Sequence, residues 1–227
     1  ASAVNMNNTA VGHDAGLRIT TGTSNTAIGA QAMRCGSADC TGSNNVAIGM
    51  YALDAATSAY NQIAIGTDAM GATTTGANSV AVGYYALKTN TSGDNNTAVG
   101  YNSMEFNTTG SNDTGLGYKA LEANTTGSNN TAVGYYSLAA NTTGEDNVGV
   151  GHNTLTACTD GRRNVAIGRS AGQAITSGEA NTAIGYSSLV TATTADSCTA
   201  IGQEALFYNT ADDNTAVGRS AMQNNST

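Results

Sequence analysis

Residues 130–134 read Asn-Thr-Ala-Val-Gly, and close variants of this five-residue word recur along the whole chain. The glycines that close the word stand at 12, 29, 49, 66, 83, 100, 117, 134, 151, 168, 185, 202 and 218. Ten of the twelve intervals are 17 residues long, one is 20 and the last is 16. A short period kept from end to end is typical of stacked units that each contact only their neighbours. The repeat therefore predicts a single solenoid over residues 1–227, with a three-residue insertion near 35–40.

We number each 17-residue unit, or rung, from its closing glycine as position 0. Position −1 is always Val, Ile or Leu, position −2 is Ala or Gly, and position −3 is Thr, Val or Ile. β-Branched residues at alternate positions favour a strand. A second segment follows the glycine, with a small residue at position +3 and mostly Leu or Met at position +4, and loops such as 107–110 (Asn-Thr-Thr-Gly) close the rung. We expect strand, tight turn, second strand and loop in about thirteen rungs, which is an all-β parallel solenoid or β-roll about 60 Å long.

The expected first strand is apolar or small on both of its faces. Positions −3 and −1 lie on one face and the alanine of position −2 on the other. Strands of this kind are usually buried on both sides, whereas a thin coil has only one inside. We expect further copies of the chain to cover the second face, with the row of small Ala side chains allowing close approach. The alternative is a monomeric solenoid that exposes the Ala row.

Several of these words resemble repeats of two families of attachment fibres. Asn45–Gly49, Ser79–Gly83 and Asn164–Ser170 resemble the head repeat of trimeric autotransporter adhesins, whose usual period is shorter. Asn130–Leu138 resembles repeats in the tail fibres of tailed bacteriophages. The resemblance covers nearly the whole chain. It implies a left-handed parallel β-roll assembled as a homotrimer, located in a virion tail fibre or on a bacterial cell surface.

Composition narrows the classes of partner. The net charge is −8 and the eight Lys and Arg residues do not cluster beyond Arg162 and Arg163, so we expect no nucleic-acid binding. No apolar run is long enough for a membrane span, so we expect no membrane insertion. The two histidines, His13 and His152, lie eight rungs apart. We expect no enzyme activity, no catalytic residues, no metal site and no cofactor. The glycine-rich words at 115–117 and 149–151 lack the βαβ context of a dinucleotide fingerprint.

The four cysteines fall into two groups. Cys35 and Cys40 lie in the rung with the insertion, where they could form a disulfide that pins the extra residues or remain two free thiols. Cys158 and Cys198 lie more than two rungs apart, about 10 Å along a rod of stacked strands, which is too far for a disulfide within one chain. We expect these two to be buried small residues.

Tyrosine recurs at position +1, directly after the rung glycine. These residues are Tyr84, Tyr101, Tyr118, Tyr135 and Tyr186. Four consecutive rungs would stack the first four into an aromatic ladder. Such a ladder stabilises stacked strands by itself. Exposed tyrosines also suit the recognition of sugars or proteins. If the chain binds a receptor through its flank, we expect these tyrosines to make the contact.

The sequence favours a structural, non-enzymatic attachment fibre. The first hypothesis is the shaft or receptor-binding region of a phage tail fibre, a piece of a longer protein that binds itself as a homotrimer and a cell-surface glycan or protein receptor. The second is the head of a bacterial trimeric surface adhesin, which binds host matrix or cells. Two further hypotheses are a self-assembling extracellular filament and an ice-binding solenoid. The threonines at position −3 alternate with valine and are expected to be buried, which disfavours ice binding.

Overall fold

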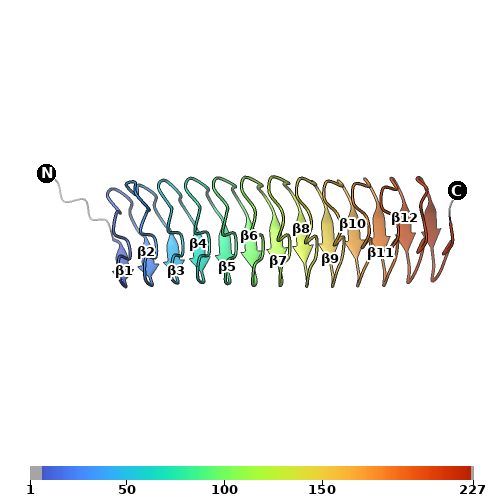
Figure 1. Ribbon diagram of the computed structural model, residues 1–227, viewed down its shortest axis with the longest axis horizontal. Helices are drawn as coiled ribbons and strands as arrows, with labels where there is room; N and C mark the ends of the chain where they lie inside the picture. Colours follow the sequence, from blue (N-terminus) through green and yellow to red (C-terminus); the bar gives the residue numbers. More distant parts are fainter. Residues whose placement is uncertain (1–6, 226–227) are drawn as a thin grey trace.

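The computed structural model describes residues 7–225 as a rod of stacked turns, with the two ends of the chain at opposite ends of the rod (Figure 1). Thirteen three-residue strands form one parallel sheet in sequence order. The strands are β1 (Thr9–Val11), β2 (Thr26–Ile28), β3 (Val46–Ile48), β4 (Ile63–Ile65), β5 (Val80–Val82), β6 (Thr97–Val99), β7 (Thr114–Leu116), β8 (Thr131–Val133), β9 (Val148–Val150), β10 (Val165–Ile167), β11 (Thr182–Ile184), β12 (Thr199–Ile201) and β13 (Thr215–Val217). The predicted all-β parallel solenoid is confirmed.

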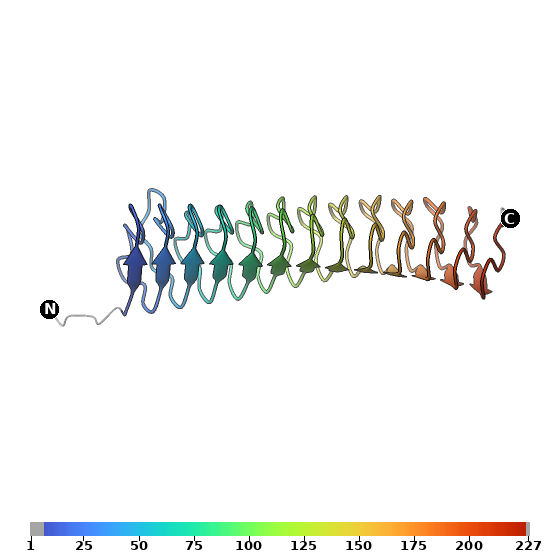
Figure 2. The same ribbon diagram turned by 90° about the horizontal axis from the view of Figure 1, so that it is seen from below.

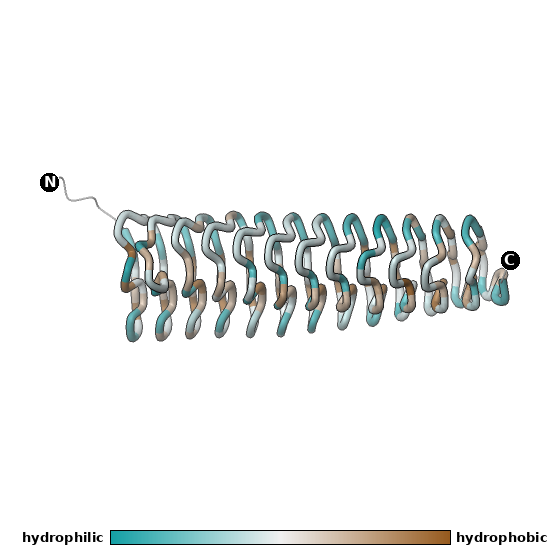
Figure 3. Tube along the Cα trace, turned by 45° about the horizontal axis from the view of Figure 1, so that its top comes forward, coloured by the Kyte–Doolittle hydropathy of each residue, from teal (hydrophilic) through white to brown (hydrophobic). Residues whose placement is uncertain are grey.

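Equivalent residues of successive rungs lie directly beside one another. In β8 and β9, for example, Thr131 pairs with Val148 and Val133 with Val150. The backbone N–H of Thr131 donates to the Asn147 carbonyl at 2.8 Å, so each rung is bound to the next along the rod axis. The same bands of hydropathy therefore recur from turn to turn (Figure 3).

The prediction of a second strand after the glycine is wrong. Positions +2 and +4 adopt positive φ in most rungs, as at Lys119 (φ 55) and Leu121 (φ 53). Alternation of left-handed residues coils this segment and prevents the extended conformation of a strand. It still binds the next rung, because the N–H of Leu121 donates to the Ser137 carbonyl at 3.0 Å.

The two faces of the strands are also the reverse of the expectation. From β2 onward the alanines at position −2 are buried, as Ala132 and Ala166 illustrate at 0% exposure, and they pack against the Leu or Met of position +4. Positions −3 and −1 instead face outward and are half-buried or exposed. A coil of 17 residues leaves an interior only wide enough for one small side chain opposite one large one. For this reason Ala lies inside, and the β-branched residues form the outer face of the sheet.

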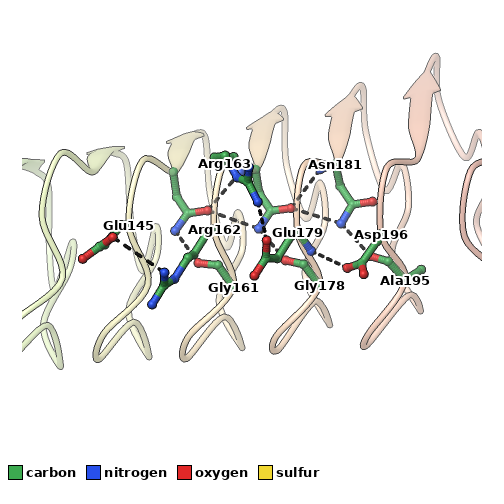
Figure 4. Close-up of polar contacts among 11 residues, drawn as sticks. Glu145, Gly161, Arg162, Arg163, Gly178, Glu179, Asn181, Ala195 and Asp196 are labelled. Atoms are coloured by element: carbon green, nitrogen blue, oxygen red, sulfur yellow. Dashed lines mark hydrogen bonds and ion pairs between the residues drawn. The ribbon is translucent and has the colours of Figure 1, made fainter.

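A column of polar side chains at position −4 runs through the interior. In most rungs this residue is Asn, whose Oδ1 accepts from the backbone N–H of position −4 in the next rung and whose Nδ2 donates to a loop glycine carbonyl. Asn147 shows both contacts: its Oδ1 accepts from the Asn164 N–H at 3.0 Å, and its Nδ2 donates to Gly161 O at 2.8 Å. Figure 4 shows the same pattern at Asn181, which donates to Ala195 O. The column satisfies buried backbone groups that no strand partner reaches.

The first residue of each Asn-Thr-Thr-Gly loop, and of the Asn-Thr-Ser-Gly loop at 90–93, also points inward. Asn90, Asn107, Asn124 and Asn141 are fully buried and form a second amide ladder, in which each Nδ2 donates to the preceding Oδ1 at 2.8–3.0 Å. The threonine that follows each asparagine donates its hydroxyl to the equivalent carbonyl of the next rung. The loops are therefore part of the hydrogen-bonded rod, and the buried asparagines are inaccessible to glycosylation in the folded chain.

The insertion between β2 and β3 bulges from the otherwise regular row of loops (Figure 2). Its tip, residues 37–39, is exposed, whereas Cys35 and Cys40 at its two ends are buried. Downstream, the 17-residue register resumes at once, since Val46 pairs with Ile63 and Ile48 with Ile65. The extra residues are thus accommodated outside the rod without disturbing the sheet.

Candidate binding surface

Four of the five predicted tyrosines form a continuous ladder on the flank of the rod. The ring centroids of Tyr84, Tyr101, Tyr118 and Tyr135 are 5.2, 5.4 and 5.1 Å apart in succession, with interplanar angles of 10–11°. This spacing is close to the strand spacing of a sheet, as expected for equivalent residues of stacked rungs. The predicted ladder over these four rungs is present.

The glycine at position 0 makes this stacking geometrically regular. At Gly151, φ is +139°, and an added Cβ would lie 2.7 Å from the carbonyl oxygen of Gly168 in the next rung. A side chain at this position would push the rungs apart. With glycine in every rung, the backbones approach closely and each residue at position +1 lies over its counterpart.

The stacking determines which atoms of the ladder meet solvent. Each inner ring has both faces occupied by its neighbours, so only ring edges and phenolic hydroxyls are exposed, and the four residues are 39–46% exposed. The ladder therefore offers a row of hydroxyl donors and acceptors rather than flat aromatic faces. Such a row suits hydrogen bonds to the hydroxyls of a glycan or to the backbone of a protein.

A second row of aromatic and charged side chains supports the ladder at positions +2 and +5. Tyr85 stacks on Tyr84 with centroids 3.8 Å apart, and a hydrogen bond between the two raises the pKa of Tyr84. Lys88 lies over the Tyr85 ring at 3.7 Å. Lys119 pairs with Glu122 at 2.9 Å, and that contact raises the pKa of the ammonium group. Cation–π and ion-pair contacts hold these long side chains against the rod.

The ladder differs from the prediction at two residues: it includes His152, which was not predicted, and it excludes Tyr186, which was. His152, which was not among the predicted ladder residues, is exposed and stacks on Tyr135 at 4.9 Å with an interplanar angle of 16°. Its place at position +1 was the signal that pointed to it. Tyr186 also lies at position +1 and is 49% exposed, but Arg169 occupies that position in the intervening rung. Tyr186 is therefore separated from the ladder.

The outward face of the sheet is the other large feature of the surface. It consists of positions −3 and −1 of thirteen rungs and carries only Thr, Val, Ile and Leu. Leu116, Ile167 and Val217 are among its exposed members, at 45%, 40% and 68% exposure. None of its residues is charged, so the rod has one long uncharged face beside the tyrosine ladder. An apolar face of this extent is typical of an interaction surface.

Charged residues lie on the loops instead, where several are paired (Figure 4). Arg162 contacts Glu145 at 3.9 Å, Arg163 pairs with Glu179, and the Glu179 N–H donates to Asp196 Oδ1 at 2.7 Å. These side chains are exposed, so each pair contributes little to stability. The two adjacent arginines of the chain, Arg162 and Arg163, therefore each lie beside a carboxylate. Their positive charge is balanced, so they do not form a basic binding patch.

The remaining polar residues do not assemble into a chemical centre in the part of the chain that is described. No group of three or more His, Cys, Asp or Glu residues is arranged to hold a metal ion within residues 7–225. Cys158 and Cys198 are buried, as predicted, and burial raises the pKa of Cys158 to about 11. Gly115 and Gly149 lie in strands of the solenoid, where each receives a serine hydroxyl on its carbonyl. Within the same residues, no helix has the length and apolar character needed to cross a membrane.

Comparison with known proteins adds no relative to this description. No protein-family model matches the chain, and no curated protein matches it significantly.

Proposed function

We propose that this chain is the shaft or receptor-binding region of a tailed-phage tail fibre, a non-enzymatic attachment fibre in which three parallel copies associate. The observation that carries the proposal is the uncharged outer face of the sheet, which runs over all thirteen strands. Its apolar side chains are left half-exposed in a single chain, and burying them is favourable in proportion to the area removed from water.

A further copy of the chain is the partner that fits this face best. The face repeats at the rung spacing of about 4.8 Å, and a second rod of the same sequence presents the same spacing over the same length. Side chains of the two rods then interdigitate at every rung. A globular partner would match this period over a few rungs only.

The size of the face is sufficient for a stable assembly. Thirteen rungs about 4.8 Å apart and a width of about 10 Å give roughly 600 Å² per chain. Two chains that cover each other's outer face would together bury about 1,200 Å², which is the lower end of the range for specific, stable interfaces. The number three rests on the resemblance to trimeric attachment fibres, and the face supports association as such.

The proposed role is mechanical and positional. Continuous backbone pairing and two interior amide ladders make a stiff rod that could hold an adjoining receptor-binding part at a distance from its base. The tyrosine ladder lies beside the proposed interface, and its exposed hydroxyls are the atoms we propose for contact with a cell-surface glycan or protein. A bacterial adhesin head would use the same outer sheet face and the same tyrosine ladder. Sequence adjoining this rod would distinguish a phage tail fibre from a bacterial adhesin.

The mass of the purified chain in solution tests the association. One chain has a mass of 22.7 kDa, and light scattering on a size-exclusion column is expected to give about three times that value. Substituting Val99, Leu116 and Val133 by Glu places three charges on the outer face in consecutive rungs and should produce monomers. Substituting Thr109, Thr126 and Thr143 by Glu adds the same charges to exposed loop positions of nearby rungs and should leave the mass unchanged. A monomeric parent chain, or no difference between the two variants, would overturn the proposal.

The outward-facing threonines favour one other function, which is ice binding. Thr97, Thr114 and Thr131 stand in consecutive rungs on the outer face rather than in the interior, contrary to the expectation that argued against ice binding. Valine at positions 148 and 165 interrupts this row. A thermal-hysteresis measurement on the monomeric triple variant and on the parent chain would test whether the face binds ice.

A further inference from the structure

The inserted loop between β2 and β3 turns two free cysteines inward at its two ends. Cys35 and Cys40 are the first and last residues of a six-residue loop, and both are buried, at 1% and 0% exposure. The residues between them are partly or fully exposed, so the loop turns its two ends inward and its tip outward. The Cys35 thiol donates to Met33 O at 3.2 Å, and the two cysteines are near enough for each to shift the pKa of the other. Within residues 7–225, no other two cysteines lie at the ends of one loop.

The backbone fixes the two ends of the loop independently. Cys40 is anchored to the preceding rung: its N–H donates to Arg18 O at 2.9 Å and its carbonyl accepts from the Thr20 N–H at 3.0 Å. Cys35 adopts φ 69°, a left-handed conformation that directs its side chain inward, and its carbonyl accepts from the Ala38 N–H at 3.2 Å. These contacts hold both ends of the loop within one chain, so the two thiols lie near each other without any contact from another chain.

We propose that Cys35 and Cys40 form a disulfide that closes the inserted loop and acts as a redox latch on this end of the rod. The proposal is independent of the attachment function, since it concerns a different part of the surface. A crosslink of two residues within one loop removes conformational freedom from the opened state of that loop. It would protect the inserted segment of the solenoid from local opening and from proteolysis at its exposed tip.

The oxidation is a thiol–disulfide exchange with a low-molecular-weight disulfide such as oxidised glutathione. The neighbouring Cys35 thiol lowers the pKa of the Cys40 thiol, so we assign the first attack to Cys40. Its sulfur bonds to one sulfur of the external disulfide and releases the first thiolate. Cys35 then loses its proton, attacks the Cys40 sulfur and releases the second thiolate, which closes the Cys35–Cys40 bond. Two protein thiols are oxidised, one external disulfide is reduced to two thiols, and the thiol protons pass to the released thiolates.

Trypsin provides a direct readout, because it separates this pair from the other cysteines. Cleavage after Arg34 and Lys88 releases residues 35–88, which contain Cys35 and Cys40 and no other cysteine. We would incubate the folded chain with oxidised glutathione, then unfold it in concentrated denaturant with iodoacetamide so that every remaining thiol is alkylated, digest it and weigh the peptides. The expected result is a 35–88 peptide two hydrogens lighter than the reduced form and without alkylation, while Cys158 and Cys198 are alkylated.

Two variants and a series of urea concentrations show whether the disulfide forms between Cys35 and Cys40. The variant Cys158→Ala/Cys198→Ala should form the latch as the parent does. The variant Cys35→Ala cannot close the bond and should retain glutathione on Cys40. Because the thiols are buried, the incubation is repeated at rising urea concentration below the cooperative unfolding of the rod, and closure should quicken as the loop opens. Full alkylation of Cys35 and Cys40 throughout this series, or glutathione left on the parent chain without closure, would overturn the proposal.

Discussion

Asp113 stands where most rungs carry a buried asparagine. Its Oδ1 accepts from the Asn130 N–H at 2.7 Å and its Oδ2 from Asn124 Nδ2 at 3.2 Å, so it keeps the acceptor contacts of the amide column. Unlike asparagine, however, the ionised carboxylate has no N–H to donate. Burial raises the pKa of Asp113 to about 7, which means that the folded rod holds a proton there that the unfolded chain loses at a much lower pH.

The sign of the resulting pH dependence follows from proton binding. The folded pKa exceeds the ordinary value of 3.8, so this group costs nothing at pH values below 3.8, destabilises increasingly up to about pH 7, and costs a constant amount above. Asp113→Asn should therefore raise the free energy of unfolding by about 2–4 kcal/mol at pH 8 and by almost nothing at pH 3.5. Urea unfolding at both pH values measures the difference, with Asp160→Asn on an exposed loop as the control. An equal gain at both pH values would contradict the explanation.

Ala180 illustrates a second way in which a single residue lowers the free energy of unfolding, which is a left-handed backbone conformation. It has φ 56° at position −5, where several other rungs carry the more tolerant Asn, and its side chain is exposed. A left-handed conformation costs a residue with a Cβ about 1 kcal/mol, and glycine removes that cost. Ala180→Gly should stabilise the rod by about 0.5–1 kcal/mol, whereas Ala140→Gly, at a position with ordinary φ, should destabilise it. Denaturant midpoints measured on the two variants test this, and destabilisation of both would show that the strain is absent.

Within one rung, large and small side chains are exchanged between positions +4 and +7. Most rungs place Leu or Met at +4, but residue 172 is Gly, and in that rung position +7 is the fully buried Ile175. A Cβ added to Gly172 would lie 3.1 Å from Ile175 Cδ1 and 3.0 Å from Leu155 Cδ2, so the isoleucine fills the space that a leucine occupies elsewhere. The adjacent rung solves the same problem with Leu189 and Ala192, both fully buried.

This exchange predicts strong coupling between the two positions. Gly172→Leu alone overpacks the interior and should destabilise by about 1–3 kcal/mol. Ile175→Ala alone leaves a cavity and should cost about 2–5 kcal/mol. The double variant reproduces the Leu189/Ala192 arrangement and should recover most of both losses. Free energies of unfolding for the four chains give the coupling energy, and simple addition of the two losses would refute the compensation.

The same elements show where prediction from sequence succeeds and where it fails. Glycine spacing was enough to predict thirteen stacked rungs and the ladder from Tyr84 to Tyr135, because identical residues in register must stack. The prediction of which strand face is buried was wrong. Alternation along a strand shows that Ala132 and Val133 point in opposite directions, but it does not show which of them points inward. The interior width decides that, and it depends on the path of the whole rung. The prediction of a second strand was wrong because Leu has no preference for positive φ. The sequence at Leu121 therefore gives no sign of the left-handed conformation.

The rod as a whole should behave as a chain of nearly equivalent units. Each rung contacts only its two neighbours, so stability is expected to be the sum of rung terms and interface terms. Deleting residues 118–134 removes one complete rung and joins Gly117 to Tyr135, which restores the same word, the same sheet register and the tyrosine ladder. The shortened chain should fold and lose one increment of stability, and removing 101–134 should cost about twice as much.

Chemical denaturation followed by circular dichroism at fixed chain concentration measures these increments. The dependence of the unfolding free energy on denaturant should fall in proportion to the rungs removed, since it scales with the surface exposed on unfolding. Deleting 118–126 provides the matched control, because it removes about half a rung and places loop residues opposite strand residues. That chain should be unable to pair across the junction and should lose far more stability than the longer deletion. If the half-rung deletion were the better tolerated of the two, in-register stacking would not be what holds the molecule together.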